Sequence, residues 1–346
     1  MPAATTHTQA LIAFDMDGVL VDVSRSYREA TRRACRLFFT GARGWQDLPD
    51  PLFSLAELTK IKQSGGLNND WDVTCRVIEL LCQRVTKPRT AHPGGLPGAG
   101  ISWKIYQTAL SGWDVTPLTR FLNSTQYPLT ELLAQSAGDD AADTFVAAAC
   151  QKDVGNGNII KQIFQEIYLG PTLFLDTYGF PPALHTDKGL NTQEKPLIEP
   201  SAIGRLAERN ILAVATGRPG SEARYGLDML GFRKYFTRVL TLDDCLAAEQ
   251  ALLKNGRTKR SLSKPDPFML DAIAEQTGEL PATRYYVGDM PDDMLAASRS
   301  RAGFIGIGFT ASVENKVQLE KTLLAAGAGQ VFDTTDSLVR FLSAAA

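Results

Sequence analysis

Short runs of apolar residues alternate along the chain with longer segments in which apolar residues recur every three or four positions. The first run, residues 11–14, is continuous, which is typical of a strand buried on both faces of a parallel sheet. Further strands are expected at 211–215, 238–241, 285–287 and 304–308. Helical patterns separate them, at about 201–207, 221–230, 243–254, 267–276, 292–300 and 335–343. This alternation predicts an α/β fold with a doubly wound parallel sheet.

A long, mostly helical segment separates the first strand from the rest of this pattern. Its helices are expected at about 22–40, 51–63, 73–84, 117–122, 128–137, 141–151 and 157–169. Proline and glycine interrupt the pattern over residues 85–100, and prolines do so again over residues 171–199. The sequence therefore predicts two domains. Residues 1–20 and 200–346 form an α/β core, and residues 21–199 form a helical domain inserted after the first strand.

Composition and charge narrow the class of protein. A chain of 346 residues has room for about two domains. The formal net charge of −2 gives no electrostatic reason to expect nucleic acid or an anionic membrane as a partner. No stretch approaches the roughly 20 apolar residues that span a bilayer, and Met1 to Gln9 lack the features of a secretory signal. We expect a cytoplasmic protein that is a monomer or a homodimer.

Cysteine and histidine provide few candidates for a metal, redox or catalytic site. The five cysteines are scattered without a Cys-x-x-Cys pair, so a zinc site or a redox motif is not indicated. We expect them to be buried free thiols in a reducing compartment. With only three histidines in the chain, a catalytic triad or a histidine-ligated metal has few candidates.

Polar residues gather at the ends of three predicted strands and in one loop. They are Asp15-Met16-Asp17-Gly18, Thr216-Gly217, Lys264 in a Lys-Pro-Asp-Pro segment, and residues 288–293. Taken singly, each has an ordinary structural explanation: an exposed turn, a helix cap, a solvated loop or the N-terminus of a helix. Strand ends of a parallel sheet meet at one edge, however, and two acids one residue apart there favour a bound cation. Carboxylate oxygens are the ligands that Mg²⁺ prefers.

These four segments, in this order, resemble those of the haloacid dehalogenase-like hydrolase superfamily, in its phosphatase branch. The helical insertion resembles the C1-type cap of subfamily IA, although it is far longer than usual. The segments Gly65 to Trp71 and Thr216 to Pro219 resemble a poorly characterised subgroup of that family.

The resemblance implies a role for each matching residue. Asp15 would be the nucleophile that forms an aspartyl-phosphate, and Asp17 would be the general acid and then the general base. Thr216, helped by the N–H of Gly217, would donate a hydrogen bond to a phosphoryl oxygen. Lys264 would neutralise Asp15 and the phosphoryl group.

The same resemblance implies a Mg²⁺ site. Asp15 and Asp289 would bind the ion directly, Asp17 through its backbone carbonyl, and Asp293 directly or by orienting its water ligands. Gly18 would let the chain turn closely around the phosphate.

Asp17 limits the kinds of reaction that the resemblance allows. Relatives that are dehalogenases lack an acid two residues after the nucleophile, and phosphonatase relatives replace it. The first hypothesis is therefore a Mg²⁺-dependent phosphatase acting on a small phosphomonoester, a sugar phosphate or a similar metabolite. The alternatives are a phosphomutase of the same fold and a non-catalytic protein that binds a phosphorylated metabolite.

Residues outside the core motifs would select the substrate. The candidates are Lys62, Asn69, Asp70, Trp71 and Arg218. Asn69 or Asp70 could instead cap the next helix, and Trp71 could belong to a core. Arg218 could pair with Glu222, four residues further along the chain.

Overall fold

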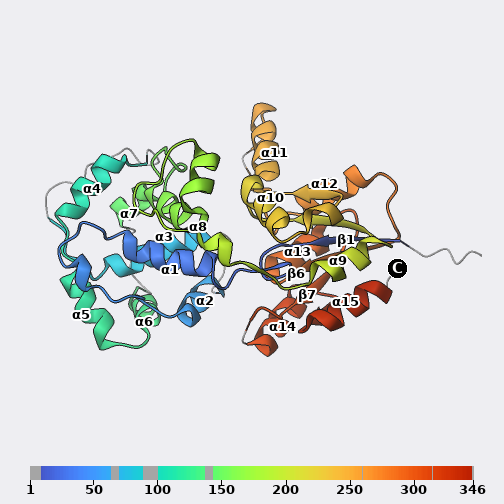
Figure 1. The fold of residues 1–346 in the computed structure, drawn as a ribbon, viewed down its shortest axis with the longest axis horizontal. Helices are drawn as coiled ribbons and strands as arrows, with labels where there is room; N and C mark the ends of the chain where they lie inside the picture. The colour runs from blue at the N-terminus through green and yellow to red at the C-terminus, as the bar shows by residue number, and fades with distance from the viewer. Residues whose placement is uncertain are drawn as a thin grey trace, which may run out of the picture. The chain divides into compact units, whose positions relative to one another are not determined.

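The computed structural model describes residues 9–63, 70–88, 100–136, 143–258, 260–313 and 315–344. The chain divides into two compact units, drawn as ribbons in Figure 1. Met1–Val23 and Glu194–Ala346 form an α/β unit, and Ser24–Gln193 form a helical unit. The sequence-based boundaries lay at residues 20 and 200.

The α/β unit is built on a parallel sheet of six strands in the order β5-β4-β1-β6-β7-β8. The strands are β1 (Ala10–Phe14), β4 (Ile211–Ala215), β5 (Arg238–Leu240), β6 (Thr283–Gly288), β7 (Ile305–Phe309) and β8 (Gln330–Phe332). The chain starts in the middle with β1, extends the sheet to one side with β4 and β5, and then to the other side with β6 to β8. The predicted fold class, a doubly wound α/β fold, is confirmed.

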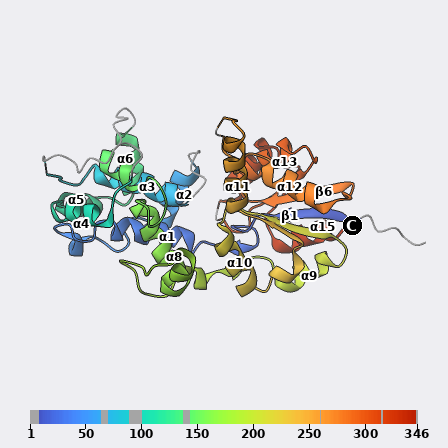
Figure 2. The same ribbon diagram turned by 90° about the horizontal axis from the view of Figure 1, so that it is seen from above.

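Helices cover both faces of the sheet, because alternate residues of each strand point to opposite sides. On one face Ile12 and Phe14 pack against α9 (Pro200–Ala207), α10 (Gly220–Met229) and α15 (Thr335–Ala344). On the other face Leu11 and Ala13 pack against α11 (Leu242–Lys254), α12 (Phe268–Thr277) and α13 (Pro291–Arg299). In Figure 2, α12 and α13 lie on one side of β1, and α9 and α10 lie on the other.

A pair of very short strands marks the boundary between the units. The chain leaves the α/β unit just after β2 (Val21–Asp22) and re-enters it just before β3 (Lys195–Pro196). The two strands pair antiparallel, with Val21 opposite Pro196 and Asp22 opposite Lys195. The chain therefore leaves and re-enters the α/β unit at neighbouring positions.

The helical unit packs around α1, α3 and α8. Its helices are α1 (Tyr27–Leu37), α2 (Leu55–Gln63), α3 (Asp70–Cys82), α4 (Trp103–Ser111), α5 (Thr116–Ser124), α6 (Pro128–Gln135), α7 (Thr144–Ala149) and α8 (Ile159–Tyr178). Tyr27 of α1 stacks on Tyr168 of α8, with 4.2 Å between the ring centroids. Helix α8 kinks at Gly170, where an added Cβ would come within 2.4 Å of the backbone nitrogen of Gly189. Short 3₁₀ helices lie at Trp45–Asp47 and Leu190–Gln193 in this unit, and another lies at Arg233–Tyr235 in the α/β unit.

Some elements differ from those predicted. Helix α2 begins at Leu55 rather than at Asp50-Pro51, because Ser54 accepts a hydrogen bond from the N–H of Glu57. Helices α4 and α14 (Lys316–Ala325) and strand β8 were not predicted, and the three residues of β8, one exposed and two partly buried, are too few to show a clear periodicity. Among the described residues, none of the helices combines the length and apolar character needed to cross a bilayer.

The expectation that all five cysteines are free is wrong. Cys75 of α3 and Cys150, the residue after α7, are joined by a disulfide, with their Cα atoms 6.3 Å apart. These cysteines are 75 residues apart in sequence, and only the packing of α7 against α3 brings them together. Cys35, Cys82 and Cys245 are free and buried.

Two leucines test the packing of the sheet. Leu338 of α15 is fully buried, whereas Leu324 of α14 is 47% exposed. We expect Leu338→Ala to lower the free energy of unfolding by about 2–5 kcal/mol, because it removes buried methyl groups and leaves a cavity. Leu324→Ala, the matched control, should change it by less than about 1 kcal/mol. Denaturant unfolding followed by circular dichroism measures both, and equal effects would contradict this assignment of the core.

Candidate active site

Three strand ends bring polar residues together at one edge of the sheet. Strand β1 lies between β4 and β6, with Phe14 opposite Val214 on one side and Val287 on the other. Asp15, Thr216 and Asp289 follow these strands directly, each at a C-terminal end. The N–H of Asp15 donates to the carbonyl oxygen of Val287 at 2.9 Å, which fixes the start of the turn after β1. Ligands bind at this edge in open α/β sheets.

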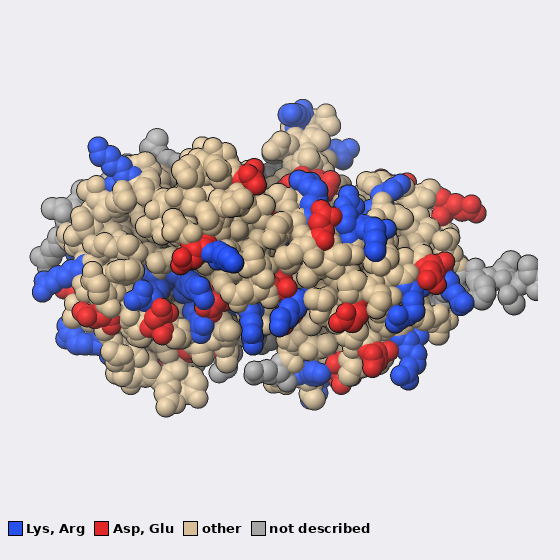
Figure 3. Space-filling model, in the orientation of Figure 1, with Lys and Arg blue, Asp and Glu red and all other residues tan. Residues whose placement is uncertain are grey.

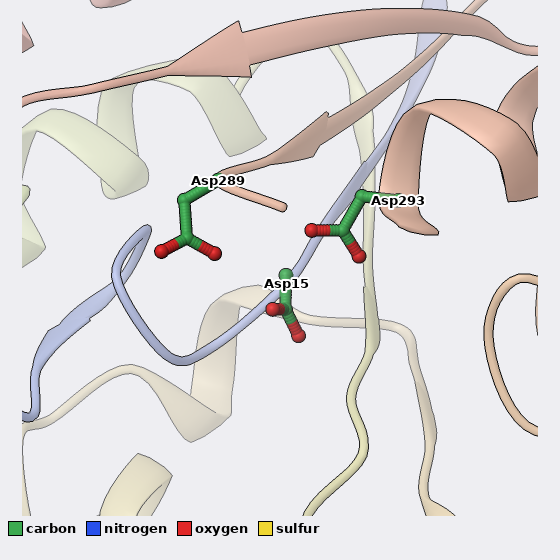
Figure 4. A group of neighbouring side chains, drawn as sticks. All are labelled: Asp15, Asp289 and Asp293. Carbon is green, nitrogen blue, oxygen red and sulfur yellow. The ribbon is translucent and has the colours of Figure 1, made fainter. Parts of the chain in front are cut away.

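Three buried carboxylates converge there. Asp15, Asp289 and Asp293 each offer one oxygen, and these oxygens all lie within 4.8 Å of one another. Asp293 comes from the first turn of α13, and Figure 4 shows the three side chains gathered at one place. Like charges this close and this well buried destabilise one another. An all-oxygen set of this kind fits a hard divalent cation such as Mg²⁺.

Lys264 supplies a positive charge beside this group. Its Nζ lies 3.0 Å from Oδ1 of Asp15 and 2.7 Å from Oδ1 of Asp293. Burial opposes the charge on Lys264, but the two carboxylates outweigh this effect and raise its pKa well above the ordinary value. Lys264 is therefore a fixed cation in the site.

Asp293 and Tyr286 hold the lysine in place. Asp293 is fully buried, and its Oδ2 accepts the N–H of Met290 at 3.0 Å. The Tyr286 hydroxyl accepts from Nζ of Lys264 at 3.2 Å and lies 3.0 Å from Oδ1 of Asp293. It also lies 3.0 Å from the carbonyl oxygen of Ala215. Tyr286 was not among the predicted site residues, because within the strand it is indistinguishable from an apolar core residue.

The protonation of Asp15 reflects this environment. Burial raises its pKa most, Lys264 lowers it, and Asp293 and Asp17 raise it again, so that the pKa is about 7 instead of 3.8. A cation among the three carboxylates would favour the ionised form of Asp15.

Gly18 brings the turn after β1 against the carboxylates. Its φ of 74° lies in the left-handed region, which glycine adopts readily. A Cβ at this position would lie 2.0 Å from Oδ2 of Asp289. The resemblance implied that the chain turns closely around a phosphate at Gly18, and in the structure this turn lies against Asp289.

The Asp17 carboxylate contacts Arg218 and is not one of the three converging carboxylates. Its side chain is 34% exposed, and Oδ1 accepts a hydrogen bond from Nε of Arg218 at 2.7 Å. Arg218, a predicted substrate-binding residue, has a buried guanidinium that also bonds both carboxylate oxygens of Glu194. Sequence reasoning missed Glu194, which lies in a segment that showed no motif.

Thr216 and Gly217 follow β4 in the neighbouring turn. Thr216 is fully buried, and its Oγ1 accepts the N–H of Arg218 at 3.2 Å. An added Cβ at Gly217 would meet nothing within 4 Å, so there is open space beside this residue. The turn can thus present a hydroxyl and an N–H at the edge of the sheet where Asp15 also lies.

The predicted substrate-binding residues of the helical unit remain predictions. Lys62 lies in α2, but its side chain is outside the described part of the structure, as is the whole of Asn69. Asp70 is the first residue of α3. Trp71 packs edge-on against Phe164, with ring centroids 6.3 Å apart, and Nζ of Lys161 lies 4.8 Å from its ring centroid.

Charge on the surface is mixed. On the face that Figure 3 displays, acidic and basic side chains are interspersed on each unit. This mixture on the displayed face agrees with the net charge of −2.

The pKa of Asp15 leads to a prediction about metal binding. Below about pH 7 a cation must displace the proton of Asp15, whereas above it the carboxylate is already ionised. The affinity for Mg²⁺ should therefore rise about tenfold between pH 6 and pH 8, with proton release at pH 6. Titration calorimetry in buffers of different ionisation enthalpy measures both quantities. An affinity that does not change with pH would contradict a ligand role of Asp15 with this raised pKa.

Comparison with known proteins gives the family. The family model of the haloacid dehalogenase-like hydrolases matches residues 10–301. An X-ray structure determined as a Northeast Structural Genomics Consortium target is 20% identical to the chain. It covers 97% of this chain and 98% of its own, with a TM-score of 0.61, which shows a shared fold. No curated protein matches the chain.

Two further solved structures are similar at lower scores. Phosphatase Tt82 from Thermococcus thioreducens is 21% identical over 91% of this chain and 99% of its own, with a TM-score of 0.49. A putative beta-phosphoglucomutase from Thermotoga maritima is 18% identical over 97% of this chain and 99% of its own, with a TM-score of 0.44. Because the family model spans most of the chain, including every segment that forms the site, the protein belongs to the haloacid dehalogenase-like hydrolases.

Proposed function

We propose that the protein is a Mg²⁺-dependent phosphatase that hydrolyses a small phosphomonoester, such as a sugar phosphate. The observation that carries this proposal is the convergence of three buried carboxylates with Lys264 next to Asp15. The set contains a nucleophile, a place for one cation and a fixed positive charge. Phosphoryl transfer requires these components, because most of its catalysis is positioning and charge neutralisation.

Asp15 would act first, as the nucleophile. One of its carboxylate oxygens forms a bond to phosphorus while the bond between phosphorus and the ester oxygen breaks. Asp17, two residues further on, donates its proton to that oxygen, which leaves as an alcohol. The products of this half-reaction are the free alcohol and an aspartyl-phosphate on Asp15.

Water completes the reaction. Asp17, now a carboxylate, accepts a proton from the water as its oxygen bonds to phosphorus. The bond between phosphorus and the Asp15 oxygen breaks, which restores the Asp15 carboxylate and releases inorganic phosphate. Asp17 ends with the proton that it needs for the next cycle.

The remaining residues would bind charge. Lys264 balances the charge of Asp15 and of the phosphoryl oxygens, and Thr216 and Gly217 donate hydrogen bonds to those oxygens. Asp15, Asp289 and Asp293, with the backbone carbonyl of Asp17, would hold Mg²⁺ or its water ligands. Bound there, the ion would neutralise charge on the phosphoryl group.

The setting of this activity is part of the proposal. The substrate would be a small phosphorylated metabolite in the cytoplasm, and the active species a monomer or a homodimer. Neither nucleic acid nor a membrane would take part.

Removal of the nucleophile tests the proposal. Against a panel of phosphorylated metabolites and p-nitrophenyl phosphate, the wild-type protein should release inorganic phosphate, and EDTA should abolish the release until Mg²⁺ is restored. Asp15→Asn should lower kcat at least about 1,000-fold, because the amide cannot form the covalent intermediate. Asp228→Asn, on the exposed face of α10, is the matched control and should keep full activity.

The same assay separates the alternatives. A phosphomutase would move the phosphoryl group within a sugar phosphate and release little inorganic phosphate. Binding of Mg²⁺ without turnover of any member of the panel would contradict the phosphatase proposal and favour a non-catalytic binding protein.

A further inference from the structure

Arg218 lies between two carboxylates of the α/β unit. Its Nη1 and Nη2 are 3.1 and 3.0 Å from the two oxygens of Glu194, which is a bidentate arrangement. Its Nε and Nη2 are 2.7 and 2.6 Å from Oδ1 of Asp17. The side chains of Arg218 and Glu194 are both only 1% exposed.

We propose that Arg218 and Glu194 are positioning residues that hold the carboxyl group of Asp17 where it exchanges protons with the substrate. This inference rests on the proposed function, in which Asp17 is the general acid and base. Asp17 lies in a turn and is partly exposed, so that its side chain needs a partner to keep one orientation. Among the described residues, Arg218 is the partner of its carboxylate.

The geometry of the contact suits a proton donor. Both contacts of Arg218 are to Oδ1 of Asp17, and Oδ2 takes no part in them, so that Oδ2 can carry the transferred proton. Glu194 accepts hydrogen bonds from both Nη atoms of Arg218, which fixes the plane of the guanidinium and so the direction of its bonds to Asp17.

The local fold makes room for this buried pair. Gly226 of α10 faces it, and a Cβ there would come within 3.2 Å of Nη1 of Arg218 and 3.9 Å of Oε2 of Glu194. Burying two charges costs desolvation energy, and well-packed apolar residues often stabilise a fold as well or better. A buried pair that also contacts Asp17 is therefore better explained by a geometric role than by stability.

Two conservative variants loosen the contact in different ways. Glu194→Gln keeps the size of the side chain but removes its charge and one of its two acceptors. Arg218→Lys keeps the positive charge but loses the planar fork. The double variant Arg218→Met/Glu194→Leu removes both charges of the pair together, so it serves if a single variant does not fold.

The test compares two substrates of similar shape. Phenol is a poorer leaving group than p-nitrophenol, so that phenyl phosphate depends more strongly on proton donation. Under single-turnover conditions we expect each variant to release phenol about 10- to 100-fold more slowly than the wild type, because general acid catalysis contributes about 10²–10⁴-fold. Release of p-nitrophenol should slow by less than about threefold. In the steady state, KM should stay unchanged for both substrates.

Two controls separate positioning from a general loss of structure. Leu338→Ala, which lowers stability elsewhere in the same unit, should keep the wild-type ratio of the two rates. In an Asp17→Asn background, Glu194→Gln should cause no further loss of either rate, because the group that it positions has been removed.

The outcomes are distinct. Equal slowing with both substrates, a full rate with both, or an additional loss in the Asp17→Asn background would overturn the positioning role and leave the phosphatase proposal standing. A wild-type protein that hydrolyses neither substrate would overturn the proposed function, and this inference with it.

Discussion

Electrostatic repulsion among three buried carboxylates is the constraint on which the rest of the site depends. Asp15, Asp289 and Asp293 are brought together by two strand ends and one helix start, and burial makes their mutual repulsion stronger. Lys264 offsets part of it through Asp15 and Asp293. Burial, more than repulsion, keeps the pKa of Asp15 raised even with Lys264 beside it. The cation of the proposed function would neutralise these carboxylates further.

The fold meets this electrostatic cost with a rigid framework. Strand β1 is fully buried and paired on both sides, so the turn that carries Asp15 starts from a fixed point. Gly18 and Gly288 allow backbone to approach carboxylates more closely than any side chain would permit, with an added Cβ 2.0 Å from Asp289 and 2.3 Å from Asp293. Tyr286 fixes the amine from within the sheet. Packing energy from the two apolar layers thus maintains an arrangement of charges that would otherwise separate.

Much of the fold, and the convergence of its acids, could be predicted from sequence, because parallel strands place their C-terminal ends at one edge. Asp15, Lys264 and Asp289 sit in short local patterns with a clear physical meaning. Glu194 carries no such pattern, and its pairing with Arg218 depends on contacts between segments distant in sequence. For the same reason the sequence did not show the disulfide between Cys75 and Cys150. The start of α2 was missed for a local reason, because it depends on a single capping serine, Ser54.

The pairing of β2 with β3 has a consequence for how such a chain can vary. Asp22 lies opposite Lys195, so the last residues before the helical unit and the first residues after it form the stem of an antiparallel ribbon. A two-residue turn could connect these two positions. All six strands of the main sheet lie outside the helical unit, so a change in the length of that unit leaves the residues of the sheet unchanged.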